Sequence, residues 1–411
     1  MGVALFHLVG GVGAVVTWSV ARRTETPTIV RIIVAGWFAK LIGTLARFYV
    51  LQVVYDGTGD ANRYSRVGAQ VATMLRTGEL TWHRPGSAVV GTHFVEYVTG
   101  SIFTVTGPTT LGGFVVFSAA SFVGIYLVFR AVRVLIPGVD ERRYALLLFF
   151  LPSMVFWPSS IGKEALMILA IGLFALGAAR LFLHVRGGVV LLAAGCLLSA
   201  AIRPHITLIL VAALLLATVI ASPTTPATEL PIGKLFRVGL AAAVLVWAAA
   251  SAGSFLEVEP LDRGAVSAAL ESTADRTDTG GSAFTNVNPV LFPVAAVTVL
   301  FRPFPFEAGN VPGLIASAEG MLLLTITFRH RRTILVALKS LRTSPLLAMS
   351  FCYIVLFVYA YTGFNNFGLL SRQRCQVYPF VLLVLCCPPR LLARGERQPR
   401  PDAHAIPAGS P

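Results

Sequence analysis

The sequence has little charge and almost no lysine. Only 13% of its 411 residues are charged, whereas 55% are hydrophobic, and soluble domains usually carry about 25% charged residues. A soluble fold of this length could not bury so much apolar surface. Lysine occurs only at positions 40, 163, 234 and 339, so arginine carries almost all of the formal net charge of +14. A basic membrane protein needs no nucleic acid as a partner, and we expect none.

Cysteine is scarce as well. The chain has five cysteines, all within or at the edge of apolar runs and without a CxxC spacing, which argues against a disulfide framework or a zinc site. No basic residue precedes the first apolar run, so we expect that run to be a retained helix and not a cleaved signal peptide.

Apolar runs of roughly 20 residues, separated by short polar joints, fill most of the chain and are typical of a polytopic membrane protein. We predict an all-α fold with about eleven transmembrane helices. The expected spans are 2–20, 30–54, 110–134, 144–158, 163–183, 187–202, 204–222, 236–254, 312–328, 344–363 and 375–389. Two further runs, 93–108 and 287–301, are shorter or rich in Gly and Pro, and we interpret them as re-entrant or interfacial helices in outer loops.

Arginine and lysine flank every second joint between these spans, and the positive-inside rule places those joints in the cytoplasm. The chain then consists of a membrane domain over residues 1–390 and a disordered cytoplasmic tail at 391–411. Two large outer loops are expected within the membrane domain. The first, 55–109, carries juxtamembrane helices, and the second is 255–311.

Several cations break the positive-inside rule, because they lie in the joints predicted to be outside. They include Arg63, Arg66, Arg84, Lys163, Arg203, Arg302, Arg372 and Arg374. Cations near lipid are costly and usually serve a pathway, a partner or an anion, and the guanidinium fork binds phosphate oxygens in pairs. Such cations around one outer cavity would bind a phosphate or diphosphate. The alternative is that each side chain only anchors its own helix end at the interface.

The first outer loop begins with YDGTGDANRYSR, residues 55–66, which holds two acids in a Gly-rich turn. Asp60 is the first candidate for a general base that deprotonates an acceptor hydroxyl, and Asp56 is the second. Asp60 could instead, or in addition, cap the amphipathic stretch that follows it. Glu307 is a further candidate, either orienting an acceptor or pairing with Arg302.

Other polar residues near these joints have weaker signals. His205 could relay protons or donate to a phosphate, although a histidine at a helix start is more often structural. Glu164 is expected to be the ion-pair partner of the adjacent Lys163. His83 and His93 flank the first loop and, with Asp56 and Asp60, could bind a divalent cation. Their spacing is not diagnostic, and no metal or other cofactor is certain.

The segment Gly59–Tyr64, GDANRY, follows an early transmembrane helix and matches the pattern GDA-x-x-Y. It resembles the first outer loop of GT-C-type glycosyltransferases. The resemblance implies a multi-spanning enzyme that acts on a polyprenyl-phosphate-linked sugar, with Asp60 as its catalytic acid/base and Tyr64 shaping the site. The extra N-terminal helix departs from that family, in which the first span leads straight into the acidic loop.

Later blocks, namely FWPSSIGKE, RPH, RPFPFE and NFGLLSRQR, resemble bacterial envelope proteins near the O-antigen and exopolysaccharide polymerases. Those polymerases use outer arginines to hold undecaprenyl-diphosphate glycans. Both resemblances place the chain in the bacterial plasma membrane, among membrane lipids, with its active site facing outward.

Three functions follow as expectations. The first is a glycosyltransferase that moves a sugar from a polyprenyl-phosphate-linked donor to an envelope glycan, lipid or protein. The second is a polymerase or ligase acting on undecaprenyl-diphosphate glycans. The third is a lipid-linked sugar transporter or flippase, which Lys40 and Arg47 inside the second apolar run would favour, although Arg47 could instead reach toward the outer cavity. A shared donor site requires Asp60 to lie within about 15 Å of at least one of the outer cations.

Overall fold

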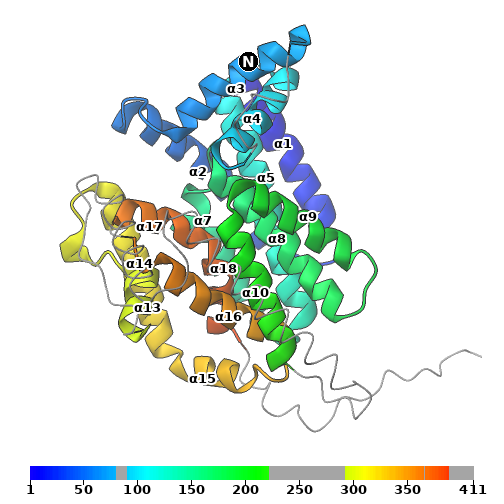
Figure 1. Ribbon diagram of the computed structural model, residues 1–411, viewed down its shortest axis with the longest axis vertical. Coiled ribbons are helices and arrows are strands. Elements are labelled where there is room, and N and C mark those ends of the chain that lie inside the picture. Colours follow the sequence, from blue (N-terminus) through cyan, green and yellow to red (C-terminus); the bar gives the residue numbers. More distant parts are fainter. Residues whose placement is uncertain (80–89, 222–291, 365, 388–411) are drawn as a thin grey trace, which may run out of the picture.

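The computed structural model describes residues 1–79, 90–221, 292–364 and 366–387, and these residues form helices and loops without a strand (Figure 1). Five of the described helices are long and apolar enough to cross a membrane, namely α1 (Gly2–Ala21), α2 with its π-helical extension η1 (Pro27–Val54), α5 (Thr110–Leu135), α8 (Lys163–Phe182) and α14 (Val311–Arg329). Four shorter apolar helices are α9 (Gly188–Ile202), α10 (Pro204–Ile220), α13 (Phe292–Phe301) and α16 (Pro345–Tyr361). The fold is therefore that of an α-helical membrane protein, as predicted.

Two of the predicted spans differ from single crossing helices. The run 144–158 forms α6 (Glu141–Phe150) and α7 (Pro152–Phe156), because a proline inside a helix removes a hydrogen-bond donor and clashes with the preceding turn. In the run 375–389, α18 covers only Tyr378–Leu385, roughly 12 Å at 1.5 Å per residue. The predicted span 236–254, residues 255–291 of the second outer loop and the tail 391–411 lie outside the described residues.

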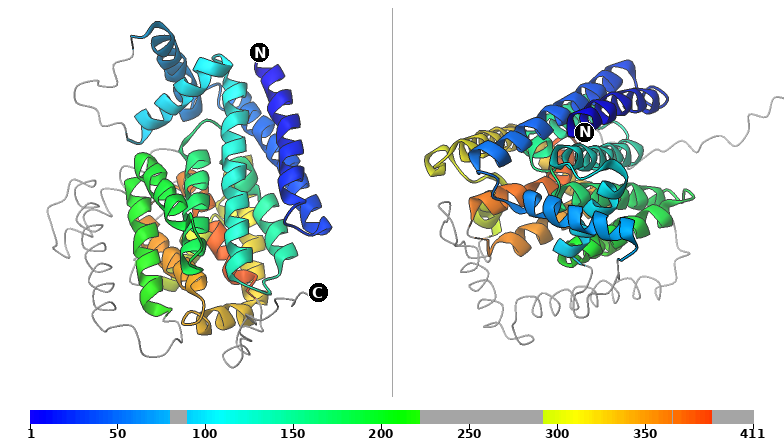
Figure 2. Two further views of the ribbon diagram at one scale, coloured as in Figure 1. Left: turned by 90° about the vertical axis from the view of Figure 1, so that its right-hand side faces the viewer. Right: turned by 90° about the horizontal axis from the view of Figure 1, so that it is seen from above.

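Helix α8 lies in the interior of the bundle, and its backbone touches the backbones of α5 and of the more peripheral α9 (Figures 1 and 2). A Cβ added at Gly124 of α5 would lie 2.3 Å from the Ile168 carbonyl of α8. A Cβ at Gly177 of α8 would lie 2.3 Å from the Leu192 amide nitrogen of α9. Small residues allow this close approach, which is a main source of helix association in membranes.

One end of the bundle is covered by a helical pair, α3 (Asp60–Thr77) and α4 (Thr92–Thr106), and the N-terminus lies at the same end (Figure 2). The two helices pack through Gly68 and Gly100, since a Cβ at Gly100 would lie 2.4 Å from Val71 Cγ1. Helix α15 (Arg331–Lys339) lies at the opposite end (Figure 1). The run 93–108 thus forms part of this covering pair.

Contacts between joints that are distant in sequence divide the joints into two groups. These groups are the same as those predicted from the arginine pattern, cytoplasmic and outside. At the α3–α4 end, Ser65 Oγ lies 2.8 Å from Thr110 Oγ1, and the Gly91 amide donates to the Ala201 carbonyl at 2.8 Å. At the other end, Arg143 Nη1 lies 3.2 Å from His330 Nδ1. The joints predicted to be outside therefore meet at one end, which is where the candidate site lies.

Candidate functional site

The loop before α3 is fixed by local geometry and by one amide. Asp56 and Gly57 adopt left-handed backbone conformations, with φ angles of 46° and 70°, which turn the chain sharply after η1. The Asn62 side chain donates to the Gly57 carbonyl at 2.8 Å and accepts a hydrogen bond from Gln52 at 3.1 Å. Glycine tolerates such angles without strain, so the GTGDAN sequence can close this turn and start α3 at Asp60.

Asp60 does not cap α3, contrary to the alternative drawn from the sequence. The N-cap residue is Gly59, and no side chain makes a capping hydrogen bond there. The Asp60 carboxylate turns instead toward α17 (Phe367–Gln373), where Arg372 Nη1 lies 3.1 Å from its Oδ2 atom. The condition that Asp60 should lie within reach of an outer cation is therefore met.

Asp60 is the first member of a chain of ion pairs that joins four distant segments. Arg372 uses its other terminal nitrogen, Nη2, to contact Glu164 Oε2 at 2.8 Å. The second Glu164 oxygen accepts from Arg203 Nη2 at 2.7 Å. Arg203 Nη1 in turn donates to Gln373 Oε1 at 2.6 Å. We call Asp60, Arg372, Glu164 and Arg203 the carboxylate–arginine chain.

The side chains of the carboxylate–arginine chain are positioned by the ends of helices. Glu164 lies in the first turn of α8, where the free backbone N–H groups and the helix dipole favour a carboxylate. Arg203 stands at the break between α9 and α10, directly before Pro204. Asn366 caps α17, because its side chain accepts from the Leu369 amide at 3.1 Å, and so fixes the short helix that carries Arg372.

The two carboxylates differ sharply in exposure. The Asp60 side chain is 58% exposed, whereas that of Glu164 is 3% exposed. Burial disfavours the charged guanidinium of Arg372, but the nearby carboxylates of Glu164 and Asp60 outweigh burial and raise the pKa of Arg372 above its ordinary value. Glu164 therefore holds two arginines in place, while Asp60 remains open to a reacting molecule.

Two more cations lie close to this chain without a carboxylate of their own. The Arg47 guanidinium lies 5.1 Å and 5.0 Å from the ring centroids of Phe156 and Trp157. Its Nε and Nη1 atoms are buried and have no hydrogen-bond partner among the described residues. Lys163, at the start of α8, makes no hydrogen bond or ion pair within the described part of the chain. Four cations thus surround two carboxylates, which favours an anion at this end.

Sequence reasoning missed the role of Glu164 and gave Arg47 only as a residue that could reach toward the outer cavity. Glu164 was expected to pair with the adjacent Lys163, and that expectation was wrong, because its carboxylate faces Arg203 and Arg372 instead. An acid in the first turn after a Gly-Lys step is the only signal that the sequence offers for it. Arg47 lies inside an apolar run, and only the fold shows how close it comes to the chain.

Three predicted site residues lie around α3 and α4. Arg63 contacts Glu96 of α4 at 3.4 Å and its side chain is 62% exposed, so it is not part of the carboxylate–arginine chain. His93 also contacts Glu96, at 3.0 Å. Tyr64 is buried, and burial together with the negative charge of Asp60 raises the pKa of its phenol. Tyr64 therefore lines the side of Asp60 as a neutral group.

Arg302 and Glu307 pair with each other, as one of the sequence hypotheses predicted. Glu307 lies in η2 (Pro305–Glu307) and also accepts from the Phe304 amide at 2.7 Å. Burial opposes its ionisation, but these hydrogen bonds and the Arg302 charge outweigh burial and lower the pKa of Glu307. Arg302 also stacks 5.1 Å from the ring centroid of Phe367, so the pair borders the N-terminus of α17.

Arg374 has a different place from the one predicted. It lies in η3 (Arg374–Gln376) and is buried. Its guanidinium donates to the Val299 carbonyl at 2.6 Å and to the Thr298 carbonyl at 3.3 Å. These carbonyls end α13 and have no partner within the helix, so Arg374 holds α13 and is not free to bind a ligand.

The remaining candidates lie outside the carboxylate–arginine chain. Asp56 is exposed and makes no hydrogen bond or ion pair within the described ranges. His205 lies in the first turn of α10, two residues after Arg203. Among the described residues, no group of three or more His, Cys, Asp or Glu is arranged to hold a metal ion. His83, the remaining member of the suggested divalent-cation set, lies outside the described residues.

No family model, no curated protein and no solved structure matches this chain. The structure alone therefore defines its class, an α-helical membrane protein with a cation-rich polar cluster at the end of the bundle covered by α3 and α4. What this cluster does is inferred from its chemistry.

Proposed function

We propose that this protein is a glycosyltransferase of the bacterial plasma membrane. It moves a sugar from a polyprenyl-phosphate-linked donor to a glycan, lipid or protein acceptor on the extracytoplasmic face. The observation that carries this proposal is the pairing of an exposed carboxylate, Asp60, with a group of buried and half-buried cations that outnumber the carboxylates beside them. In this proposal the α3–α4 end faces outward, and the whole chain crosses the membrane about eleven times.

Each part of the cluster has a role in such a transfer. Asp60 accepts the proton of the acceptor hydroxyl as the new bond forms between the acceptor oxygen and the anomeric carbon. The bond between that carbon and the donor phosphate breaks, and the polyprenyl phosphate leaves with the electron pair. Arg47, Lys163 and Arg372 stabilise the negative charge that grows on the phosphate.

The geometry of Arg372 links donor binding to the state of Asp60. One terminal nitrogen of Arg372 faces the exposed Asp60 and the other faces the buried Glu164. A donor phosphate competes with Asp60 for the first nitrogen, while Glu164 keeps the guanidinium in position. Binding of the donor thus releases the Asp60 carboxylate, so that it can take a proton from the acceptor.

The second candidate is a polymerase or ligase that acts on undecaprenyl-diphosphate glycans. The surplus of cations over carboxylates favours it, because a diphosphate carries more charge than a phosphate. In that case the cations matter more than Asp60. A transporter has weaker support, because Lys40 donates to the Met154 carbonyl at 2.8 Å within the packed core and does not face the cluster.

The test compares two acids of the same loop. Asp60→Asn keeps the size of the side chain, so the protein should fold, while transfer should fall by about 10²–10⁴-fold, as expected for loss of a general base. Asp56→Asn is the matched control and should retain activity. The readout is the lipid-linked glycans of cells that lack the gene and carry each variant, with the unused donor accumulating where transfer fails.

The same experiment separates the candidates. A silent Asp60→Asn combined with loss of product in Arg47→Gln would favour the polymerase over the transferase. If neither substitution changes the lipid-linked glycans, the cluster has no part in sugar transfer and the proposal is wrong.

A further inference from the structure

A groove of about 520 Å³ lies between α1 and α2, at the end of the bundle opposite the candidate site. Its walls come from the last turns of α1, from Glu25 in the joint that follows, and from α2 between Pro27 and Phe38. Trp18, Val34 and Phe38 form apolar parts of the lining, and Arg22 and Arg31 are the two arginines in it. The volume falls within the range of small-molecule sites, about 300–1,000 Å³.

The groove has a fixed shape because α1 is held to α2 near its middle. The Trp37 indole N–H donates to the Gly10 carbonyl at 2.9 Å. Gly13 lies against the same ring, and a Cβ added there would lie 2.3 Å from Trp37 Cζ2. Elsewhere α1 has little cover, with only 6% of its apolar window buried, so the groove opens toward the surrounding lipid.

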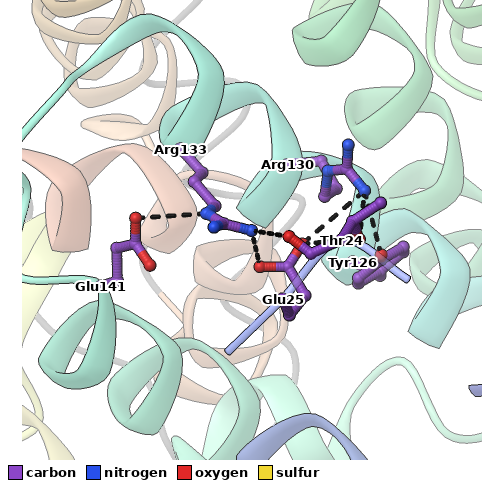
Figure 3. Close-up of polar contacts among 6 residues, drawn as sticks. All are labelled: Thr24, Glu25, Tyr126, Arg130, Arg133 and Glu141. Carbon is purple, nitrogen blue, oxygen red and sulfur yellow. Dashed lines mark hydrogen bonds and ion pairs between the residues drawn. The ribbon is translucent and has the colours of Figure 1, made fainter. Parts of the chain in front are cut away.

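The neighbouring acid does not neutralise these two arginines. Figure 3 shows Glu25 facing Arg130 and Arg133, and Arg133 extending to Glu141 at 3.2 Å. The Glu25 side chain is fully buried in this network. Arg22 and Arg31 are exposed and have no carboxylate partner among the residues that the structure describes. Arg22 instead stacks 4.2 Å from the Trp18 ring centroid.

The dimensions match one leaflet of a bilayer. From Pro27 to Phe38 the groove follows α2 for roughly 16 Å, at 1.5 Å per residue. Half of the hydrocarbon core measures about 15 Å. The charged end of the groove lies at the ends of α1 and α2, at the depth where lipid headgroups are found. The apolar wall of the groove runs along α2 from there toward the middle of the bilayer.

We propose that this groove binds an anionic phospholipid, with its phosphate between Arg22 and Arg31 and an acyl chain against Val34 and Phe38. A soluble anion would not need the apolar wall, and a zwitterionic lipid has a phosphate but no net negative charge to balance two arginines. The site is independent of the proposed sugar transfer, because it lies at the other end of the molecule and shares no residue with the cluster.

Trp18 provides the probe. The full-length chain is placed in phosphatidylcholine vesicles with a minor fraction of phosphatidylglycerol, and either lipid is replaced by its dibrominated form, which quenches indole fluorescence. We expect brominated phosphatidylglycerol to quench well beyond its share of the lipid. The difference from Trp18→Phe isolates the signal of this tryptophan from that of the others.

The double variant Arg22→Gln/Arg31→Gln should lower the preference for phosphatidylglycerol by tenfold or more, since each cation near an anionic headgroup adds to binding. Arg23→Gln, an adjacent exposed arginine outside the groove, is the matched control and should keep the preference. A second variant, Val34→Trp, fills the apolar wall and leaves both charges in place, and it should also lose the preference.

Other outcomes overturn the proposal. Equal quenching by the two brominated lipids would show that the groove does not select anionic lipid. An equal loss in Arg23→Gln would show only a general attraction of the basic surface. An unchanged preference in Val34→Trp would place the lipid elsewhere, and displacement by a protein from the same membrane would assign the groove to a partner chain.

Discussion

The two ends of the bundle hold polar clusters made from the same residue types. At one end, Glu25 and Glu141 face Arg130 and Arg133, so charges balance and the arginines are about a quarter exposed. At the other end, Asp60 and Glu164 face four cations, two of which have no carboxylate of their own. The first cluster needs nothing more to be neutral, whereas the second attracts an anion.

The comparison shows that the number of ion pairs says little about function. Both clusters join helices that are distant in sequence, and both contain a nearly fully buried glutamate between two arginines. The difference lies in what is left without a partner. A buried donor without a partner is costly. Of these two clusters, as far as the structure describes them, only the one at the α3–α4 end lies beside such a donor, Arg47, which favours a ligand at that cluster.

The largest expected effect comes from removing the central carboxylate. Among the described residues, Glu164→Gln takes the only carboxylate partner from the buried Arg203 and one of the two carboxylates from Arg372, and we expect the free energy of unfolding in detergent to fall by about 3–5 kcal/mol. Glu25→Gln, the matched change at the other end, should cost about 1–3 kcal/mol, because water can reach its arginines. Equal losses in the two variants would contradict the contrast between the clusters.

Arg47→Met should separate stability from binding. The substitution removes a buried charge without a partner, so stability should stay the same or rise by about 1 kcal/mol. Affinity for a short-chain isoprenyl phosphate should fall roughly tenfold to a hundredfold, the usual value of hydrogen bonds to a charged group. Thermal unfolding and binding are measured on the same sample.

The control for this variant is Arg130→Met in the balanced cluster. It should lower stability and leave binding of the isoprenyl phosphate unchanged. A loss of stability in Arg47→Met without a loss of affinity would show that Arg47 is only a packing residue.

The smallest expected effect is the loss of stability at low pH that comes from Glu307. The pKa of Glu307 is lowered in the fold, so Glu307 adds stability above the ordinary pKa of glutamate, and this stability is lost as the pH falls through the lowered value. We expect a contribution of about 1 kcal/mol or less, because the pair lies near the surface. Glu307→Gln should flatten this acid limb of the stability profile in urea unfolding, and an unchanged profile would argue against the pair.

The helical class and the two groups of joints could be predicted from composition and charge. The length of each apolar run and the number of arginines beside it can be counted directly in the sequence. Helix continuity could not. Pro152 divides an apolar run that hydropathy reads as one span, and the short α18 occupies another. Hydropathy is summed over the residues of a window, so it does not detect the one backbone N–H that Pro152 lacks.

For the site, sidedness was enough to predict that Asp60, Lys163, Arg203 and Arg372 share one end, but it could not predict partners. Arg374 is only two residues from Arg372, yet it faces the end of α13. Adjacent positions on a helical turn point in different directions, so the choice between ligand binding and helix capping depends on packing between distant segments, which no local pattern contains.

The glycine contacts of α8 have a consequence for motion in the site. Gly124 and Gly177 bring backbones together so closely that α8 cannot shift without separating from α5 and α9. Glu164 and Lys163 thus stand on a helix that is packed backbone to backbone against two others. Asp60 and Arg372 stand on α3 and on the seven-residue α17. We therefore expect the cluster to open through movement of these two helices relative to α8.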